Sequence, residues 1–411
     1  MSAQLIKRTC SSILLACIFC PLLTGCWDRL EIEERAVVLA IAVDVAIPNR
    51  GGEQMEVTHV EKSFPEPQGP DFQITAQIAV PGRIPLGPAN EGGGGGTSPV
   101  WVVSASGHTL DDAMSVLQQQ LADKLFLGHL RVIMVSEKVA RTGLQNLNDY
   151  LRRNPEVRRL AWLGVAKGRA EKVLRAAPQL ERVPALYLLG MFEQAVERGE
   201  YPNEFIGVFW SKRTSKGIDP ILPLFKLNKE EGSIEVTGLA YFSGDKMVGN
   251  TNSLEIGFYM ALTGRQRGGY TAFIPRYPGS REMVMISATH RKTTTKISLK
   301  NGKPQVQVQV LLEENIDENP NENSKIRKQK DLKELSQISA SMTDEGTTRL
   351  IKKLQLAGSD ILGFGEQFRA KMPDYWNRSI QTDEKWIEVF KTLTVDVDCK
   401  VSIRRVGMKA S

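Results

Sequence analysis

Histidine, cysteine and long apolar runs are scarce in this chain of 411 residues, which has four histidines and five cysteines. The two nearest histidines, His108 and His129, stand 21 residues apart, which excludes a local zinc motif and leaves open only a site assembled in space. After the first 25 residues, no stretch approaches the roughly 18 apolar residues of a membrane-spanning helix. The sequence has no Gly-x-Ser-x-Gly elbow either, so a serine hydrolase of that kind is not indicated.

Positive and negative charges are nearly balanced: the chain has 53 Lys and Arg against 47 Asp and Glu, for a formal net charge of +6. Nucleic-acid-binding domains usually carry a strongly basic face, so nucleic acid is not an expected partner. Hydrophobic residues make up 41% of the chain and charged residues 24%, which excludes a disordered or collagen-like protein. The length predicts two or three domains, each large enough to bury a core.

The N-terminus has the pattern of an export signal. Lys7 and Arg8 precede an uncharged stretch, residues 10–23, whose 14 residues are too few for a membrane span of about 20 but suit the apolar region of a secretory signal. The stretch ends in a sequence like a bacterial lipobox, in which the cysteine receives diacylglycerol: Leu23, Thr24, Gly25 and Cys26. Residues 1–25 are thus predicted to be a lipoprotein signal peptide. An ordinary secretory signal and a transmembrane anchor are the alternatives.

Processing before Cys26 would account for most of the cysteines. It removes three of them with the leader and leaves Cys399 as the single free thiol, so no intramolecular disulfide is expected. A diacylglyceryl group carries two acyl chains, which is enough for stable anchoring. The rest of the chain is therefore expected to form a folded body outside the cytoplasmic membrane.

The pattern along the mature chain predicts a multi-domain protein of mixed α/β (α+β) class, with mixed sheets and packed helices. We expect an N-terminal mixed α/β domain over residues 26–200, and an irregular connector or small middle subdomain over 201–232. A C-terminal α+β domain would follow over 233–411.

The N-terminal domain is expected to alternate strands and helices. A continuous Val- and Ile-rich run at 36–45 predicts a buried strand. Thr109 is the expected N-cap of a helix that carries acidic residues in its first turn, and Pro155 should end another helix that starts at residue 144. The remaining predicted elements are strands at 54–61, 72–80, 101–105, 131–135 and 160–166 and a helix at 170–176.

The C-terminal domain is expected to pack a long helix against a sheet. Strands are predicted at 234–242, 283–290, 293–299, 304–312 and 395–406, with a helix near 253–262. Asn301 and Gly302 indicate a hairpin. After a polar break, apolar residues recur every three or four positions from 332 to 368, which predicts one amphipathic helix ended by Pro373. Gly363 and Gly365 fall inside that helix, where each costs about 1 kcal/mol against Ala, so close approach of another backbone is expected.

No sequence pattern indicates a catalytic site, a metal site or a cofactor site. The glycine run at 92–96 lacks the Gly-Lys-Ser/Thr ending of a phosphate loop, so a surface loop is expected there. Cys399 lies in an alternating strand and is interpreted as a structural thiol. Four arginines flank Asn154 and Pro155; they would contact lipid headgroups or an acidic partner, or simply form a solvated turn.

The residues around the lipobox resemble a known family, the Ger(x)C lipoproteins, which are C subunits of bacterial spore germinant receptors. That family continues the lipobox as Gly-Cys-Trp-Asp-x-x-Glu-Ile and then has a strand that ends in Asp, as at Asp44. The matching residues near the anchor are Gly25, Cys26, Trp27, Asp28, Glu31 and Ile32. Trp27 would lie near the membrane interface, where tryptophan is favoured.

The C-terminal end carries a second resemblance to the same family. The matching positions in its final helix are Asp360, Gly363, Gly365, Glu366, Phe368, Trp376 and Trp386. Similarity extends over essentially the whole chain, and the glycine-rich loop near residue 94 departs from it.

The resemblance implies a three-domain lipoprotein on the outer face of the spore inner membrane. It would assemble with two membrane subunits, A and B, to respond to nutrients, without enzymatic activity or cofactors. The chain is therefore interpreted as a non-catalytic receptor subunit. A lipid-anchored solute-binding protein that presents a nutrient is the alternative, and would need a pocket with convergent polar groups. An extracytoplasmic hydrolase is the third hypothesis, which no motif supports.

Overall fold

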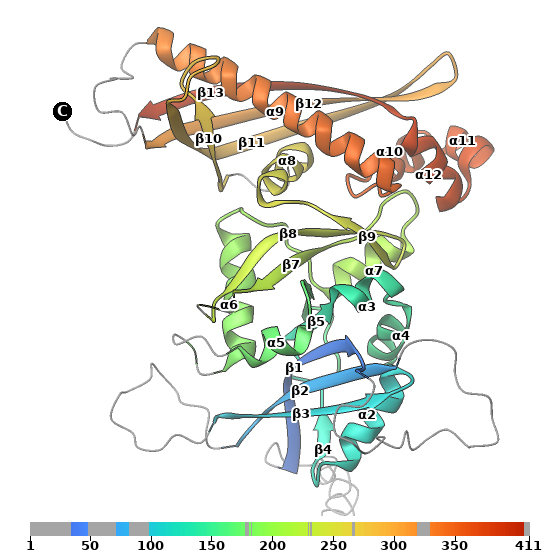
Figure 1. Cartoon of the computed structure of the whole chain (residues 1–411). Coiled ribbons are helices and arrows are strands. Elements are labelled where there is room, and N and C mark those ends of the chain that lie inside the picture. Colours follow the sequence, from blue (N-terminus) through green and yellow to red (C-terminus); the bar gives the residue numbers. More distant parts are fainter. Residues whose placement is uncertain are drawn as a thin grey trace, which may run out of the picture.

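A computed structural model describes residues 34–47, 71–81, 98–176, 181, 183–228, 230, 232–264, 268–318 and 329–406. The predicted anchor at Cys26, the residues next to it, the strand predicted at 54–61 and the glycine run at 92–96 lie outside these residues. The described part forms two sheets stacked end to end with helices around them (Figure 1).

A nine-stranded sheet forms the larger part of the molecule, in the order β3-β2-β1-β5-β6-β7-β8-β9, with β4 paired to β1. Its centre is parallel, because β1, β5, β6 and β7 run in one direction, while β2, β3, β8 and β9 add antiparallel flanks. The central strands are buried on both faces, as their continuous apolar runs predict. The strands are β1 (Arg35–Val45), β2 (Phe72–Ala79), β3 (Val100–Gly107), β4 (Lys124–Phe126), β5 (Val132–Ser136), β6 (Trp162–Ala166), β7 (Ile221–Leu227), β8 (Ile234–Ser243) and β9 (Lys246–Asn250).

Six helices cover this sheet, and several begin and end where the sequence predicts. The hydroxyl of Thr109 accepts a hydrogen bond from the backbone N–H of Asp112 at 3.1 Å, which confirms its role as N-cap. The helix before Pro155 ends at Arg153. The helices are α2 (Leu110–Gln119), α3 (Glu137–Thr142), α4 (Gln145–Arg153), α5 (Ala170–Arg175), α6 (Pro184–Glu197) and α7 (Ile206–Thr214).

The segment 201–232 is more regular than its prolines and glycines suggest. It contains α7 and β7, and β7 pairs with both β6 and β8 inside the sheet. The expectation of an irregular segment is therefore wrong at this point: Pro223 lies within β7 and is buried. The sheet continues past residue 233 through β8 and β9. The division of the chain into domains stays a prediction.

The second sheet has four strands in the order β10-β11-β12-β13. Asn301 and Gly302 form the turn between β11 and β12 with positive φ angles of 52° and 76°, as the Asn-Gly pair predicts. β11 is one long strand rather than the two expected, and β13 runs parallel to β12. The strands are β10 (Tyr270–Pro275), β11 (Met283–Lys300), β12 (Lys303–Glu318) and β13 (Thr394–Val406).

A long helix lies across one face of this sheet, and shorter helices follow at its end, near β9 (Figure 1). The single helix predicted up to Pro373 is broken. Gly358 and Gly363, with φ angles of 65° and 69°, turn the chain between two helices. The elements are α8 (Ser253–Thr263), α9 (Gln329–Ala357), α10 (Phe364–Lys371), α11 (Pro373–Tyr375), the π-helical turn η3 (Trp376–Ile380) and α12 (Asp383–Lys391).

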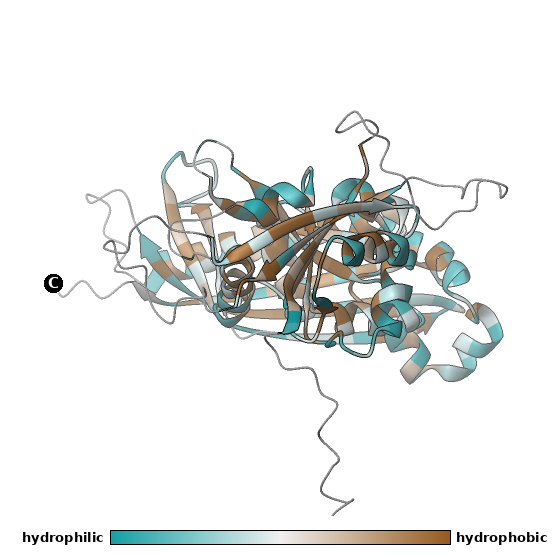
Figure 2. Ribbon diagram, turned by 90° about the horizontal axis from the view of Figure 1, so that it is seen from below, coloured by the Kyte–Doolittle hydropathy of each residue, from teal (hydrophilic) through white to brown (hydrophobic). Residues whose placement is uncertain are grey.

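The cores follow this arrangement. Apolar residues fill both sides of the nine-stranded sheet, and a third core lies between its β7–β8 edge and the four-stranded sheet. α8 bridges the two sheets, because its buried residues share a core with β8 and with β12. Figure 2 shows the inner strands mostly brown, while the outer helices carry teal stretches. The mixed fold with a long helix on a sheet is the one predicted.

Candidate functional site

The centre of the C-terminal motif is Asp360, whose side chain is fully buried at the break between α9 and α10. Its Oδ1 accepts hydrogen bonds from the backbone N–H groups of Gly363 at 2.9 Å and Phe364 at 3.2 Å. Its Oδ2 accepts from the Gly365 N–H at 2.9 Å and from the indole Nε1 of Trp386 at 3.0 Å. One carboxyl group thus holds the first turn of α10 and ties it to α12.

A second carboxyl group, that of Asp219, connects this turn to the nine-stranded sheet. Its Oδ2 accepts a hydrogen bond from the Asp360 N–H at 2.9 Å, and its Oδ1 accepts from the N–H of Gly244, in the β8–β9 turn, at 2.9 Å. The Asp219 N–H donates in turn to the Asp360 carbonyl at 2.9 Å. The two aspartates therefore form a reciprocal link between segments 141 residues apart.

The glycines of the motif allow the two backbones to approach. A Cβ at Gly365 would lie 2.4 Å from the Trp386 indole nitrogen and 2.7 Å from the Gly217 Cα. The N–H of Glu366 donates to the Gly217 carbonyl at 2.8 Å, and the Gly217 N–H donates to Asp383 at 2.9 Å. The expected close approach of another backbone is confirmed at Gly365. Gly363 instead lies outside the helix, at the N-cap of α10.

The aromatic residues of the motif pack around this link. Phe368, Trp376 and Trp386 are buried, with ring centroids 5.6 Å apart for Phe368 and Trp386 and 5.8 Å apart for the two tryptophans. Glu366 is half-buried and lines a groove of about 380 Å³ beside α7. The structure thus brings all seven motif positions together, with Glu366 at the surface.

Burial dominates the electrostatics of the linked aspartates. It raises the pKa of Asp360 to about 7 against the effect of its four donors, with the Asp219 charge adding to the increase. It raises the pKa of Asp219 to about 6, although the N–H groups of Gly244 and Asp360 stabilise the ionised form. Two enclosed carboxyl groups at a junction favour a structural role, because backbone N–H groups and the Trp386 indole occupy their oxygens.

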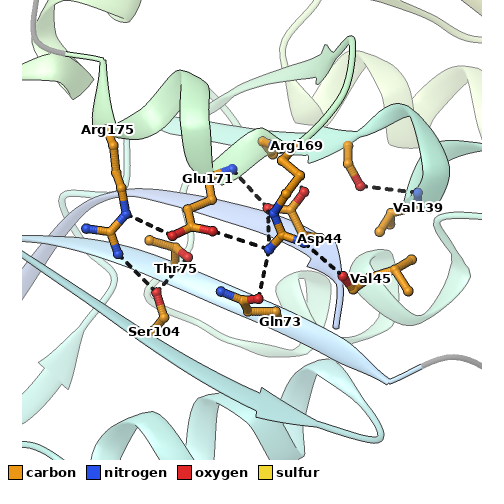
Figure 3. A network of polar contacts seen from close by, with 11 residues as sticks. Asp44, Val45, Gln73, Thr75, Ser104, Val139, Arg169, Glu171 and Arg175 are labelled. Carbon is orange, nitrogen blue, oxygen red and sulfur yellow. Dashed lines mark hydrogen bonds and ion pairs between the residues drawn. The ribbon is translucent and has the colours of Figure 1, made fainter. Parts of the chain in front are cut away.

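Asp44, at the carboxyl end of β1, has a comparable role in the nine-stranded sheet, and Figure 3 shows it beside Arg169 and Glu171. Its two carboxyl oxygens accept hydrogen bonds from the N–H groups of Ala170 at 2.8 Å and Glu171 at 2.9 Å, and so cap α5. Arg169 lies 3.8 Å from the same carboxyl group and bonds Gln73 of β2. Burial raises the pKa of Asp44, and these partners oppose the increase.

The other candidates are placed as follows. The arginines around Pro155 are exposed, and the Arg152 guanidinium lies 5.8 Å from the Trp210 ring. Cys399 is half-buried, and burial raises the pKa of its thiol to about 12, which disfavours a nucleophilic thiolate. Within the part of the chain that is described, no three His, Cys, Asp or Glu side chains are grouped to hold a metal ion.

Sequence reasoning missed Asp219, Asp383 and Gly217, which complete the link around Asp360. Gly217 and Asp219 lie far from the motif along the chain, in the segment expected to be irregular, whereas Asp383 lies within the span of the motif, at the start of α12. A single sequence carries no signal that pairs Asp219 with Asp360, since neither spacing nor periodicity relates residues so far apart.

Two family models match consecutive parts of the chain. The model described as the spore germination protein N-terminal domain covers residues 28–227, and the one described as spore germination B3/GerAC like, C-terminal, covers residues 237–407. The chain belongs to the Ger(x)C family. The boundary between the two models falls at the β7–β8 turn of the Ger(x)C chain.

Relatives of the Ger(x)C chain cover most or nearly all of its length. Spore germination protein KC of Bacillus subtilis (strain 168) is 24% identical over 98% of this chain and 97% of its own. Spore germination protein GerQC of Bacillus cereus is 26% identical over 77% of this chain and 85% of its own. The crystal structure of the GerBC protein shares the fold, with a TM-score of 0.53 and 20% identity over 82% of this chain and 95% of that one.

These matches confirm the resemblance that the lipobox region and the C-terminal motif indicate. The Ger(x)C chain is a spore germination protein of the germinant-receptor C-subunit type. The relatives are named for germination and not for an enzymatic reaction.

Proposed function

We propose that this chain is a non-catalytic, lipid-anchored C subunit of a spore germinant receptor. Cys26 would carry the diacylglyceryl anchor on the outer face of the spore inner membrane, and the folded body would assemble with the A and B membrane subunits. The match of both family models over most of the chain carries this proposal, and the lipobox before Cys26 supports the anchor. None of the helices within the described residues is long and apolar enough to cross a membrane.

The motif residues are proposed to act through structure. Asp360, Gly363, Gly365, Phe368, Trp376 and Trp386 would hold the C-terminal helices on the nine-stranded sheet, so that both parts of the subunit present one rigid surface to the receptor. Asp44 would fix α5 on the carboxyl end of β1, the end of the strand opposite the one that follows the anchor. Trp27, Asp28, Glu31 and Ile32 would keep the body close to the bilayer.

Replacement of the lipidated cysteine tests the anchor. We expect Cys26→Ala to leave the protein outside the membrane fraction and to weaken nutrient-triggered germination strongly, because two acyl chains supply the stable attachment. Cys20→Ala, the same change six positions earlier in the leader, is the matched control and should behave as wild type. Full germination by a Cys26→Ala protein that is absent from membranes would refute the anchored function.

Co-purification tests the partners. A tagged wild-type chain should retain the A and B membrane subunits after detergent extraction, at fixed stoichiometry. Recovery of the chain alone, from membranes in which both subunits are present, would count against receptor assembly.

The alternative of a solute-binding protein is favoured by one observation, a cavity in the C-terminal part that is lined by buried polar residues.

A further inference from the structure

A cavity lies between α8, α9 and the four-stranded sheet, far from Asp44 and outside the motif around Asp360. Its volume is about 80 Å³, several times the roughly 10–15 Å³ that a cavity needs to hold one water molecule. Most of its wall is apolar, with contributions from Phe258, Ile274, Ile286 and Leu312. Concave apolar spaces with a few polar groups are typical of small-molecule sites.

One of the polar residues that line the cavity is Arg291 on β11, which is 4% exposed. Its Nη2 donates hydrogen bonds to the carbonyls of Gly268 at 2.6 Å and Gly199 at 3.2 Å, which fixes the side chain. Its Nη1 is buried and has no hydrogen-bond partner among the described residues. Burial lowers the pKa of Arg291 to about 10, so the group stays a cation near neutral pH. A buried cation with an unused donor is costly unless an anionic group meets it.

The second polar group is the carboxyl of Glu314 on β12, also 4% exposed. Ser339 of α9 donates a hydrogen bond to its Oε2 at 2.8 Å. Glu314 pairs across the strands with Ala288, and Arg291 pairs with Leu312, so the two charged residues are diagonal neighbours beside the irregularity between Ala288 and His290. Within the described part of the chain they form no ion pair with each other or with any other residue.

We propose that this cavity binds a small carboxylic acid with an apolar body, whose carboxylate pairs with Nη1 of Arg291. The apolar part would contact the wall between α8 and the sheet, and Glu314, when protonated, would donate a hydrogen bond to the same carboxylate. Leu254, Phe273 and Met342 line the cavity and are also exposed, so the cavity opens to solvent between α8, β10 and α9.

Calorimetric titration of the full chain in phospholipid nanodiscs tests the site. Isovalerate and isobutylamine are the probes, since they share an apolar body and differ in a carboxylate against an ammonium group. Isovalerate should bind and isobutylamine should not. L-Valine, titrated separately, distinguishes a zwitterionic ligand from a plain acid, and binding of either carboxylate supports the proposal. Absence of binding by both carboxylates, or equal binding of isobutylamine, overturns it.

Two variants locate the binding. Arg291→Gln should weaken isovalerate binding roughly 10-fold or more, because a charged hydrogen bond is lost. Since Arg291 also bonds two backbone carbonyls, a second variant leaves it in place: Ala288→Leu extends a larger side chain into the cavity and should block binding. Arg349→Gln, an exposed change on α9, is the control. Wild-type affinity in a folded Arg291→Gln or Ala288→Leu protein overturns the site.

The pH dependence of binding tests the part played by Glu314. The titratable residues that line the cavity are Tyr270 of β10, Arg291 of β11 and Glu314 of β12, while α8 and α9 contribute apolar, glycine and hydroxyl residues. Burial raises the pKa of Glu314 to about 7. Isovalerate binding should therefore weaken as Glu314 ionises between about pH 5 and about pH 8, and Glu314→Gln should remove that change. Identical pH profiles for the two proteins would overturn the contact with Glu314.

Discussion

At the scale of the residue, single buried carboxyl groups hold the starts of two helices in place. Asp360 satisfies three backbone N–H groups and one indole, and Asp44 satisfies two N–H groups of α5. A carboxyl oxygen is the natural partner of the free N–H groups at a helix start. Removing such a residue leaves several buried donors without acceptors, which costs about 1–3 kcal/mol each.

Glu314 gives the clearest prediction at this scale, because a single hydrogen-bond donor among the described residues contacts it. Its pKa is about 7 in the folded protein and near 4.5 when exposed, so the folded state keeps its proton longer. The resulting stability is fully present below about pH 4.5 and is lost as the pH rises through about 7. We expect Glu314→Gln to be more stable than wild type at about pH 8, by on the order of 1–3 kcal/mol.

Denaturant unfolding at several pH values measures this difference. Subtracting the variant's free energy of unfolding from that of the wild type at each pH removes the contributions of other titrating groups. Glu313→Gln is the matched control, because its carboxylate points outward to Arg404 at 2.7 Å and is partly exposed. That control should show little change with pH. If the free energy of unfolding changed with pH in the same way for Glu314→Gln and the wild type, the buried, protonated carboxyl group would be contradicted.

At the scale of the element, the break between α9 and α10 distinguishes this fold from the continuous helix that periodicity predicts. The apolar stripe continues through the break, so Leu354, Ile361, Phe364 and Phe368 are all buried as expected. The backbone nevertheless turns at Gly358 and Gly363, where Asp360 caps the next helix. Periodicity therefore predicted which side chains face the core, but not where the helix stops.

Gly365 gives the prediction at this scale. A methyl group there would meet the Trp386 indole and the Gly217 backbone at 2.4–2.7 Å, and a backbone segment moves less readily than a side chain. We expect Gly365→Ala to destabilise the protein by about 1–3 kcal/mol or more, as overpacking does. Thermal and denaturant unfolding measure the change.

Gly190→Ala is the control for Gly365→Ala. Gly190 lies within α6, and a Cβ there would have open space around it. The same substitution should therefore be neutral or stabilising by about 0.5–1 kcal/mol, since alanine favours the helix. Equal effects of the two substitutions would show that the close approach at Gly365 carries no energetic cost.

At the scale of the whole molecule, the Asp219–Asp360 pair and α8 join the two sheets. Asp219 bonds the β8–β9 turn on one side and the α9–α10 break on the other. The core beneath α8 includes residues from β8 and β12, so the sheets share buried surface as well as hydrogen bonds. Hydrogen bonds and a shared core thus hold the two sheets together.

The prediction at this scale concerns the loss of the link between Asp219 and Asp360. Asp219→Ala leaves the N–H groups of Gly244 and Asp360 without their acceptors, at about 1–3 kcal/mol each. Amide hydrogen exchange should become faster in the β8–β9 turn and at the start of α10, while β1 and β5 stay protected. Asp374→Ala, on an exposed side chain of α11, should change neither region. Unchanged exchange in Asp219→Ala would show that the sheets are held together by the shared core alone.

Local patterns predicted a large part of the fold and of the motif. Continuous apolar runs identified β1, β5 and β6, strict alternation identified β12, and Thr109 and Asn301 marked a helix start and a hairpin. These features depend on residues within a few positions of one another. The motif around Asp360 was found through its likeness to the Ger(x)C family, and the anchor at Cys26 stays a prediction.

The tertiary structure alone placed β7 inside the sheet, ran β13 parallel to β12 and joined Asp219 to Asp360. It also brought Arg291 and Glu314 to one cavity between α8, α9 and the sheet. Each of these features depends on side chains and backbone groups brought together by packing, from segments separated by tens to more than a hundred residues. The periodicity of a segment reports which of its faces is buried, whereas the partner of that face is chosen by the fold.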